Sequence, residues 1–164
     1  MEPIVLRTYK CTLIPISSDK PIYVREDDPS IVVKAFSSAD NMERERDIQM
    51  RAHSIVNCPK VIDSFVENGT AYLVMEKIYG DTLYDLYGES ASSIPSYIWE
   101  KIQSLIGKLY YNDIHYIDVT PHNFMIDTHG KLVVIDFGQA YECKVNWYLK
   151  DLLDGEKSWN TDFA

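Results

Sequence analysis

Several features are scarce in this 164-residue chain, and each absence excludes something. The three cysteines, Cys11, Cys58 and Cys143, are odd in number and widely spaced, which excludes a disulfide framework and a paired metal-ligand motif. No run of 18 apolar residues occurs, and the N-terminal segment lacks a basic start and an apolar core. Neither a membrane-spanning helix nor a signal peptide is therefore expected. No glycine precedes Gly69, which excludes a glycine-rich phosphate-cradling loop before that position.

Basic residues are also outnumbered, since 25 acidic residues against 16 Lys and Arg give a net charge of -9. Nucleic acids and anionic membranes would repel such a chain, so neither is expected as a direct partner. A hydrophobic content of 46% with 12 Tyr indicates a folded protein. The length suits one compact unit or two very small lobes that share a cleft. With reduced thiols, we expect a soluble protein of a reducing compartment, cytoplasmic or nuclear.

The stretch from Ile114 to Ala140 contains the residues on which the functional prediction depends. Two short apolar runs, 124–126 and 132–135, flank the turn-forming residues 127–130 and predict a hairpin. The hairpin would bring Asn123, before its first strand, close to Asp136, after its second. Asp118 would lie on the loop that leads in. Two carboxylates and a carboxamide are hard oxygen donors, which predicts a magnesium site that holds phosphates.

The order Asp118-x-x-x-x-Asn123 followed by Asp136-Phe137-Gly138 resembles the catalytic loop and D-F-G element of the protein-kinase superfamily. That resemblance implies that Asp118 orients the attacking hydroxyl and that Asn123 and Asp136 hold the metal ions bridging the nucleotide phosphates. Tyr116-Ile117 replaces the usual His-Arg, so control by activation-loop phosphorylation is not expected. Thr120, in place of the usual lysine, resembles the small atypical kinases, of the RIO type or the kinase subunit of the KEOPS tRNA-modification complex.

The first half of the chain fits the N-lobe of such a kinase. Antiparallel strands are predicted over 12–16, 22–24, 31–36, 61–66 and 71–75, with Asn-Gly turning the last pair and a helix over 40–53. Lys34 resembles the strand lysine that contacts the nucleotide phosphates, although an isolated lysine on a strand is usually only a surface charge. The resemblance implies that a glutamate of the helix pairs with it. Glu45 is preferred because Ile48 follows at the family's spacing, and Glu43 is the alternative.

The remaining nucleotide contacts are also implied by position in the family pattern. Ser17 and Ser18, or Lys20, would replace the glycine-rich loop, although Asp19 would repel phosphate if it faced inward. Met75 would be the gatekeeper, with the Glu76 carbonyl and the Ile78 N–H serving adenine. The alternative for Met75 to Ile78 is simply the end of a strand.

The second half is short for a kinase C-lobe, since only 26 residues follow Gly138. Asp81 or Thr82 is predicted to cap a short helix, and Ser93 a longer one that leads to the catalytic loop. A last helix is predicted over 144–154, where Asp151 resembles the family aspartate that hydrogen-bonds the catalytic-loop backbone. His115 and His122 are expected to be structural. A kinase with so short a C-lobe would suit a compact genome, such as a viral one.

The expected fold is therefore α+β and two-lobed like a protein kinase, with a five-stranded antiparallel N-lobe (1–78) and a truncated helical C-lobe (79–164). The expected activity is phosphoryl transfer from ATP with Mg²⁺ to Ser or Thr of a protein, or to the chain itself. The missing glycine loop keeps two alternatives open: a pseudokinase that acts as a binding or regulatory module, and an ATPase active only with a partner. An activating partner protein is thus as compatible with the sequence as a protein substrate, and the oligomeric state stays unknown.

Overall fold

A computed structural model describes residues 1–142 and 146–163. The chain divides into two compact units, Met1–Met50 with Pro59–Ile78 and Arg51–Cys58 with Tyr79–Ala164. Residues 51–58 were expected in the first unit. They group with the second because Val134 N–H donates to Asn57 O at 3.1 Å and Arg51 Nη2 donates to Asn112 O at 3.1 Å.

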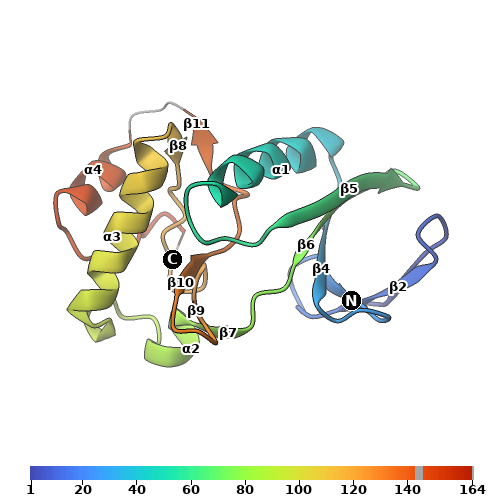
Figure 1. The fold of residues 1–164 in the computed structure, drawn as a ribbon, viewed down its shortest axis with the longest axis horizontal. Coiled ribbons are helices and arrows are strands. Elements are labelled where there is room, and N and C mark those ends of the chain that lie inside the picture. The colour runs from blue at the N-terminus through green and yellow to red at the C-terminus, as the bar shows by residue number, and fades with distance from the viewer. Residues whose placement is uncertain (143–145, 164) are drawn as a thin grey trace. The chain divides into compact units, whose positions relative to one another are not determined.

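The first unit is built on an antiparallel sheet (Figure 1). Within the described residues it has six strands in the order β1-β2-β3-β4-β6-β5. Their bounds are β1 (Ile4–Leu6), β2 (Cys11–Pro15), β3 (Ile22–Arg25), β4 (Ile31–Phe36), β5 (Val61–Glu67) and β6 (Thr70–Glu76). The five predicted strands are all present.

The strand β1 was not predicted, so the expected count of five is corrected to six. β1 is only three residues long, too short to give a recognisable alternation, and its register with β2 depends on a distant side chain. The Glu67 carboxylate accepts hydrogen bonds from Arg7 N at 3.1 Å and Thr8 N at 2.8 Å. The turn between β1 and β2 is thereby tied to the end of β5.

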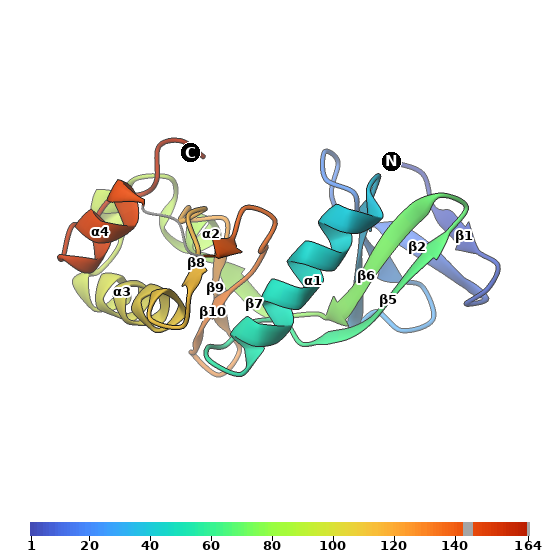
Figure 2. The ribbon, with the colours of Figure 1, turned by 90° about the horizontal axis from the view of Figure 1, so that it is seen from above.

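Alternating side chains of the sheet form two clusters, as the period of a strand requires. The helix α1 (Ala39–His53) runs beside β5 and β6 in Figure 2. Its Met42 is buried against Ala71 and Leu73 of β6, with Phe36, Val61 and Met75 packed around them. The intervening residues of β6, Tyr72 and Val74, belong to a second cluster with Leu6, Cys11, Leu13, Tyr23 and Val33.

The second unit joins helices to two small sheets. The helices are α2 (Leu83–Tyr87), the 3-10 turn η1 (Ala91–Ser93), α3 (Ser96–Tyr110) and α4 (Trp147–Leu153). Within the described residues one sheet has the order β10-β9-β7 and the other pairs β11 with β8. Their strands are β7 (Gly80–Thr82), β8 (Ile114–His115), β9 (Phe124–Asp127), β10 (Leu132–Val134) and β11 (Tyr141–Glu142).

Three helix starts were predicted in the second unit, and two of them lie at described residues. Thr82 caps α2 in a capping box, since Asp85 N donates to Thr82 Oγ1 at 3.0 Å and Thr82 N to the Asp85 carboxylate at 3.0 Å. Ser93 does not cap α3: it ends η1, and Pro95 occupies the cap position without a side-chain bond. For the last helix, Asn146 caps α4, whereas Lys144 lies outside the described residues.

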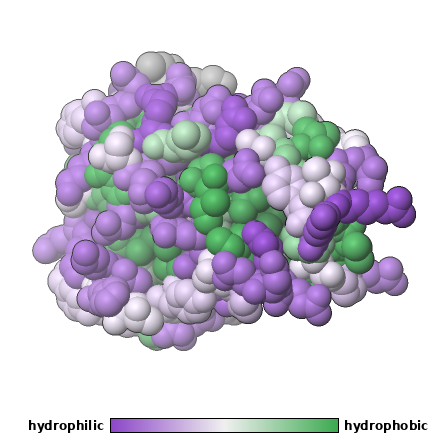
Figure 3. Space-filling model, turned by 45° about the vertical axis from the view of Figure 1, so that its right-hand side comes forward, coloured by the Kyte–Doolittle hydropathy of each residue, from purple (hydrophilic) through white to green (hydrophobic). Residues whose placement is uncertain are grey.

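α4 lies beside α3 in both ribbon views (Figures 1 and 2). The apolar positions of α3 are buried as the helical period predicts, including Ile98, Ile102, Leu105, Ile106 and Leu109. Cys11 and Cys58 are buried and not joined in a disulfide, and Cys143 lies outside the described residues. None of the described helices combines the length and the apolar character that crossing a membrane requires. Most of the face seen in Figure 3 is hydrophilic, as the high content of charged residues predicts.

Candidate active site

The predicted hairpin is present and holds one end of the candidate site. β9 and β10 pair with Leu132 opposite Ile126 and Val134 opposite Phe124. At the turn, the N–H groups of Lys131 and His129 each donate to Asp127 Oδ1 at 2.8 Å. Those bonds hold the pKa of the Asp127 carboxyl below its ordinary value, so the turn is anionic at neutral pH.

The open end of the hairpin brings the loop residues together. Ile135 N donates to Asn123 O at 2.9 Å, so Asn123 lies directly across from the residue that precedes Asp136. Asn123 is 4% exposed, and its Nδ2 donates to Asp118 O at 3.0 Å. Asn123 thus connects two segments: its side chain binds the Asp118 backbone, and its own backbone carbonyl binds Ile135, the residue before Asp136.

Asp136 has a left-handed backbone with φ of 61°, a conformation that costs free energy in a residue with a side chain. Its Oδ1 accepts a hydrogen bond from Gly138 N at 3.1 Å. The half-buried carboxylate is therefore held at a fixed turn rather than on a regular strand.

The buried Tyr116 supports the same turn, which sequence reasoning missed. Its hydroxyl donates to Ile135 O at 2.6 Å and lies 2.9 Å from Asp136 O. The ring packs edge-on against Phe137, with centroids 5.3 Å apart. Its position two residues before Asp118 was noted only as a missing histidine, although a phenol reaches backbone carbonyls as well as an imidazole does.

The loop that carries Asp118 is braced from the C-terminal segment, but not by Asp151. Asp151 is exposed on α4, so the expected hydrogen bond to the catalytic loop is wrong. Instead Asn160, 3% exposed, donates from Nδ2 to Ile117 O at 2.8 Å and from its backbone N to Val119 O at 3.0 Å. No local pattern marks Asn160, because its partner Ile117 is 43 positions away along the chain.

In the first unit, Lys34 and Glu45 form the expected ion pair. Lys34 Nζ lies 2.8 Å from Glu45 Oε1 and 3.0 Å from Oε2. The side chains are 18% and 3% exposed, so the pair is largely shielded from water. Glu43, the alternative, is exposed. A buried carboxylate needs such a partner, because an unpaired buried charge is costly.

The remaining predicted nucleotide residues also belong to the first unit. The Ser17 hydroxyl donates to Asp19 Oδ1 at 2.8 Å and accepts from Lys20 N at 3.0 Å, whereas Ser18 is exposed. The bond from Ser17 lowers the pKa of the Asp19 carboxyl, which keeps a negative charge in the turn expected to receive phosphates.

The hinge residues continue from the end of β6. Met75 pairs with Val32 across the sheet, and its sulfur lies 3.7 Å from Gln49 Nε2. The Glu76 carboxylate accepts from Lys60 N at 2.9 Å, and Ile78 is the last residue of the first unit.

The donor set is compatible with magnesium. Since Nδ2 of Asn123 is used on Asp118 O, Oδ1 is the amide atom left for a cation, and Asp136 adds a carboxylate. Among the described residues no group of three or more His, Cys, Asp and Glu is placed to hold a metal ion without other ligands. Mg²⁺ characteristically takes one or two carboxylates and completes its shell with phosphates and water, so this set fits a nucleotide-bound ion. His115 and His122 stack on Tyr110 and Tyr84, as structural residues do.

Comparison with known proteins agrees with this geometry. The chain is 26% identical over 145 residues to calcium-dependent protein kinase 3 of Plasmodium yoelii yoelii, covering 85% of this chain and 26% of that protein. It is 31% identical over 132 residues to the serine/threonine-protein kinase PrkC of Bacillus subtilis, covering 73% and 20%. The chain therefore spans about a fifth to a quarter of these relatives' lengths.

The fold also matches a solved structure, the Cydia pomonella granulovirus kinase PK-1, with a TM-score of 0.66 at 18% identity. The match covers 82% of this chain and 53% of that one, and at this identity it speaks for the fold alone. Residues 23–153 match the family model described as protein kinase domain. Together with the Asp118, Asn123 and Asp136 framework, that match means that the chain belongs to the protein kinase domain family.

Proposed function

We propose that this chain transfers the γ-phosphoryl group of ATP, with Mg²⁺, to a serine or threonine of a protein or to itself. The observation that carries the proposal is the pair of bonds made by Asn123, to Asp118 O and from Ile135 N, which gather three predicted catalytic groups on one framework. The ion pair between Lys34 and Glu45 is a second support. The viral likeness, at the level of fold, is compatible with a viral source.

Each residue has a distinct role in this proposal. Asp118 would orient the acceptor hydroxyl and accept its proton, a contribution of about 10²–10⁴-fold to the rate. Asn123 and Asp136 would hold Mg²⁺, which when bound neutralises charge on the phosphates. Lys34, fixed by Glu45, would contact the phosphates. Ser17 and Ser18 would approach them from the turn, and Met75, Glu76 and Ile78 would line the adenine site.

The turn at Ser17 favours a second candidate, a pseudokinase that binds or regulates a partner. The Ser17 hydroxyl is already used on Asp19, and Asp19 is kept anionic beside the place where phosphates would bind. Phosphate affinity would then be low, because no glycine backbone replaces the lost donors. An ATPase that needs a partner protein is the third outcome to be distinguished.

The test measures the melting temperature against ATP with and without Mg²⁺, then transfer of radiolabelled γ-phosphate to casein and to the chain itself. Asp118→Asn should keep the Mg-ATP stabilisation and lose transfer by about 10²-fold or more. Asp136→Asn should lose both, because the metal ligand is removed. Asp113→Asn is the matched control, since Asp113 is exposed and its φ of 61° suits asparagine equally well.

The outcomes separate the candidates. If Mg-ATP stabilises the wild-type protein, and phosphate transfer is lost in both site variants, the kinase is supported. Release of phosphate without transfer, only when a partner is added, supports the ATPase. No stabilisation at millimolar Mg-ATP would exclude both enzymes and leave the binding module.

A further inference from the structure

A cavity in the second unit has no place in the function proposed above. Its volume is about 710 Å³, within the range of about 300–1,000 Å³ typical of ligand sites. It is bounded by the segment after α1, one face of α3 and the turn between β9 and β10. None of the residues predicted to bind nucleotide or metal lines it. We call it the α3 cavity.

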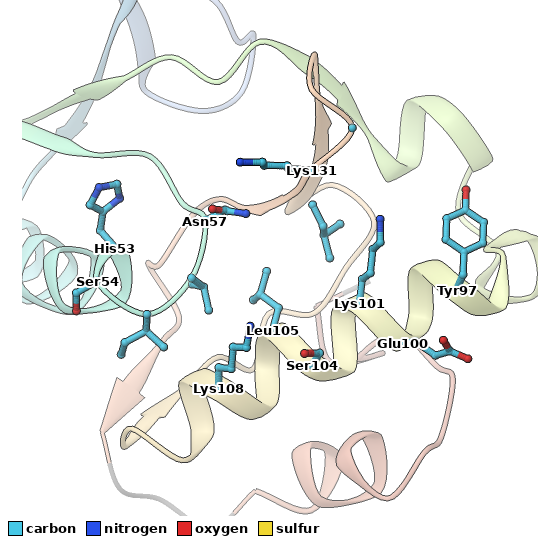
Figure 4. A pocket seen from close by; sticks show the side chains of 14 residues that line it. His53, Ser54, Asn57, Tyr97, Glu100, Lys101, Ser104, Leu105, Lys108 and Lys131 are labelled. Carbon is cyan, nitrogen blue, oxygen red and sulfur yellow. The ribbon is translucent and has the colours of Figure 1, made fainter.

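The α3 cavity is basic, although the chain has a net charge of -9. Lys101 and Lys108 of α3 and Lys131 of the β9–β10 turn line it, against a single carboxylate, Glu100. Figure 4 shows the three lysines around the same space, whereas the Glu100 carboxylate points away from Lys131. Within the part of the chain that the structure describes, none of the three ammonium groups has an ion-pair partner. Lys131 interacts with the Asp127 carboxylate of its own turn, so the excess positive charge comes mainly from Lys101 and Lys108, and it indicates a site for an anion.

The arrangement of the lysines defines the shape of that anion. Lys101 and Lys108 are seven residues apart on one helix, which separates their Cα atoms by about 10.5 Å along its axis. In an extended peptide, side chains four residues apart lie on the same face and are separated by about 13 Å, a span that two flexible lysine side chains can bridge. Ser104 lies midway between the two lysines, and the apolar side chains of Leu105 and Leu132 line the same cavity. The site thus offers two cationic positions with an apolar surface between them.

We propose that the α3 cavity is a docking site for a short, extended acidic segment of a partner protein, with carboxylates four residues apart and an aliphatic residue midway between them, on the same face. The protein's overall negative charge disfavours a long polyanion such as RNA, because its phosphates would meet repulsion beyond the cavity. A short acidic segment meets only the local positive charge. This inference does not depend on phosphoryl transfer, since the cavity shares no residue with the proposed active site.

The probe is a fluorescein-labelled ten-residue peptide with two glutamates four residues apart and a leucine midway between them, and its binding is measured by fluorescence anisotropy at 50 mM salt. Lys101→Gln combined with Lys108→Gln should raise the Kd about tenfold, because both cationic positions are lost. Lys131→Gln should raise it less. Lys60→Gln with Lys150→Gln is the matched control, an equal change of net charge at exposed lysines outside the cavity.

Further outcomes overturn the proposal. A peptide with adjacent glutamates that binds equally well would remove the spacing argument. An equal rise of the Kd in the Lys60→Gln, Lys150→Gln control would show that net charge, and not the cavity, determines binding of the peptide. Loss of wild-type binding to the probe at millimolar concentration, or preference for a phosphoserine peptide or an oligonucleotide, would assign the cavity to another ligand. Mg-ATP stabilisation should be unchanged in the Lys101 and Lys108 variant, so failure here is separable from failure of the proposed activity.

Discussion

Single side chains decide how the candidate catalytic groups are oriented, and Tyr116 is the clearest case. Its hydroxyl hydrogen-bonds to Ile135 O and to Asp136 O. Asp136 is the residue with the left-handed backbone. Tyr116→Phe keeps the ring packing and removes the hydroxyl that donates to these part-buried carbonyls, so we expect a loss of about 1–3 kcal/mol in the free energy of unfolding. The Mg²⁺ concentration for half-maximal ATP stabilisation should also rise. Urea unfolding and Mg²⁺ titration measure the two effects, and an unchanged Mg²⁺ midpoint would limit Tyr116 to a structural role.

Asn160 acts on the loop that carries Asp118 from outside the matched family region, which ends at residue 153. Asn160→Ala removes the donor to Ile117 O and the acceptor for Asp162 N, and should destabilise the protein by about 1–3 kcal/mol. Asn160→Asp keeps the acceptor but places a carboxylate against the Ile117 carbonyl, so it should not rescue. Thr161→Ala, at the adjacent exposed residue, is the control. Full stability of Asn160→Asp in urea unfolding would contradict a donor role.

At the scale of elements, the sheet of β7, β9 and β10 depends on one close approach. A Cβ at Gly80 would lie 2.1 Å from Ile126 O and 2.8 Å from Asp127 Cα, both backbone atoms. Gly80→Ala must therefore separate β7 from β9, and we expect a loss of about 1–3 kcal/mol. Thermal or urea unfolding measures it.

Gly107, inside α3, provides the contrasting substitution. An added Cβ there meets only Leu153 Cδ2, at 3.5 Å, an ordinary contact. Gly107→Ala should leave stability unchanged or raise it by up to about 1 kcal/mol, because alanine is the better helix former. Equal destabilisation by both substitutions would show that the β7–β9 contact is not the cause.

At the scale of the whole molecule, charge is the dominant property. The net charge is -9 at pH 7 and the isoelectric point is about 4.8. As the pH falls, carboxylates are protonated and the mutual repulsion of molecules decreases, so solubility should be lowest near pH 4.8. Light scattering across pH 4 to 8 measures this, and maximal scattering near neutrality would contradict it.

Local patterns predicted most of the elements. The five strands of the first sheet, α1, the Thr82 cap and both hairpins follow from alternation, helical period and turn residues that act over a few positions. The pairing of Lys34 with Glu45 was expected from the family resemblance and is present. The missed strand β1 depends on a distant residue, because Glu67 holds the turn that follows it. The expected cap at Ser93 failed for a local reason, since Ser93 ends the 3-10 turn η1.

The sequence by itself determined the family, the order of the strands along the chain and the residue types of the candidate site, because short motifs carry that information. The tertiary structure alone decided which groups brace that site, Tyr116 and Asn160, and that three lysines from two elements line the α3 cavity. The physical reason is separation along the chain. A hydrogen bond between residues 43 positions apart leaves no local pattern, and neither do charges on different elements, because only folding brings such groups to the same site.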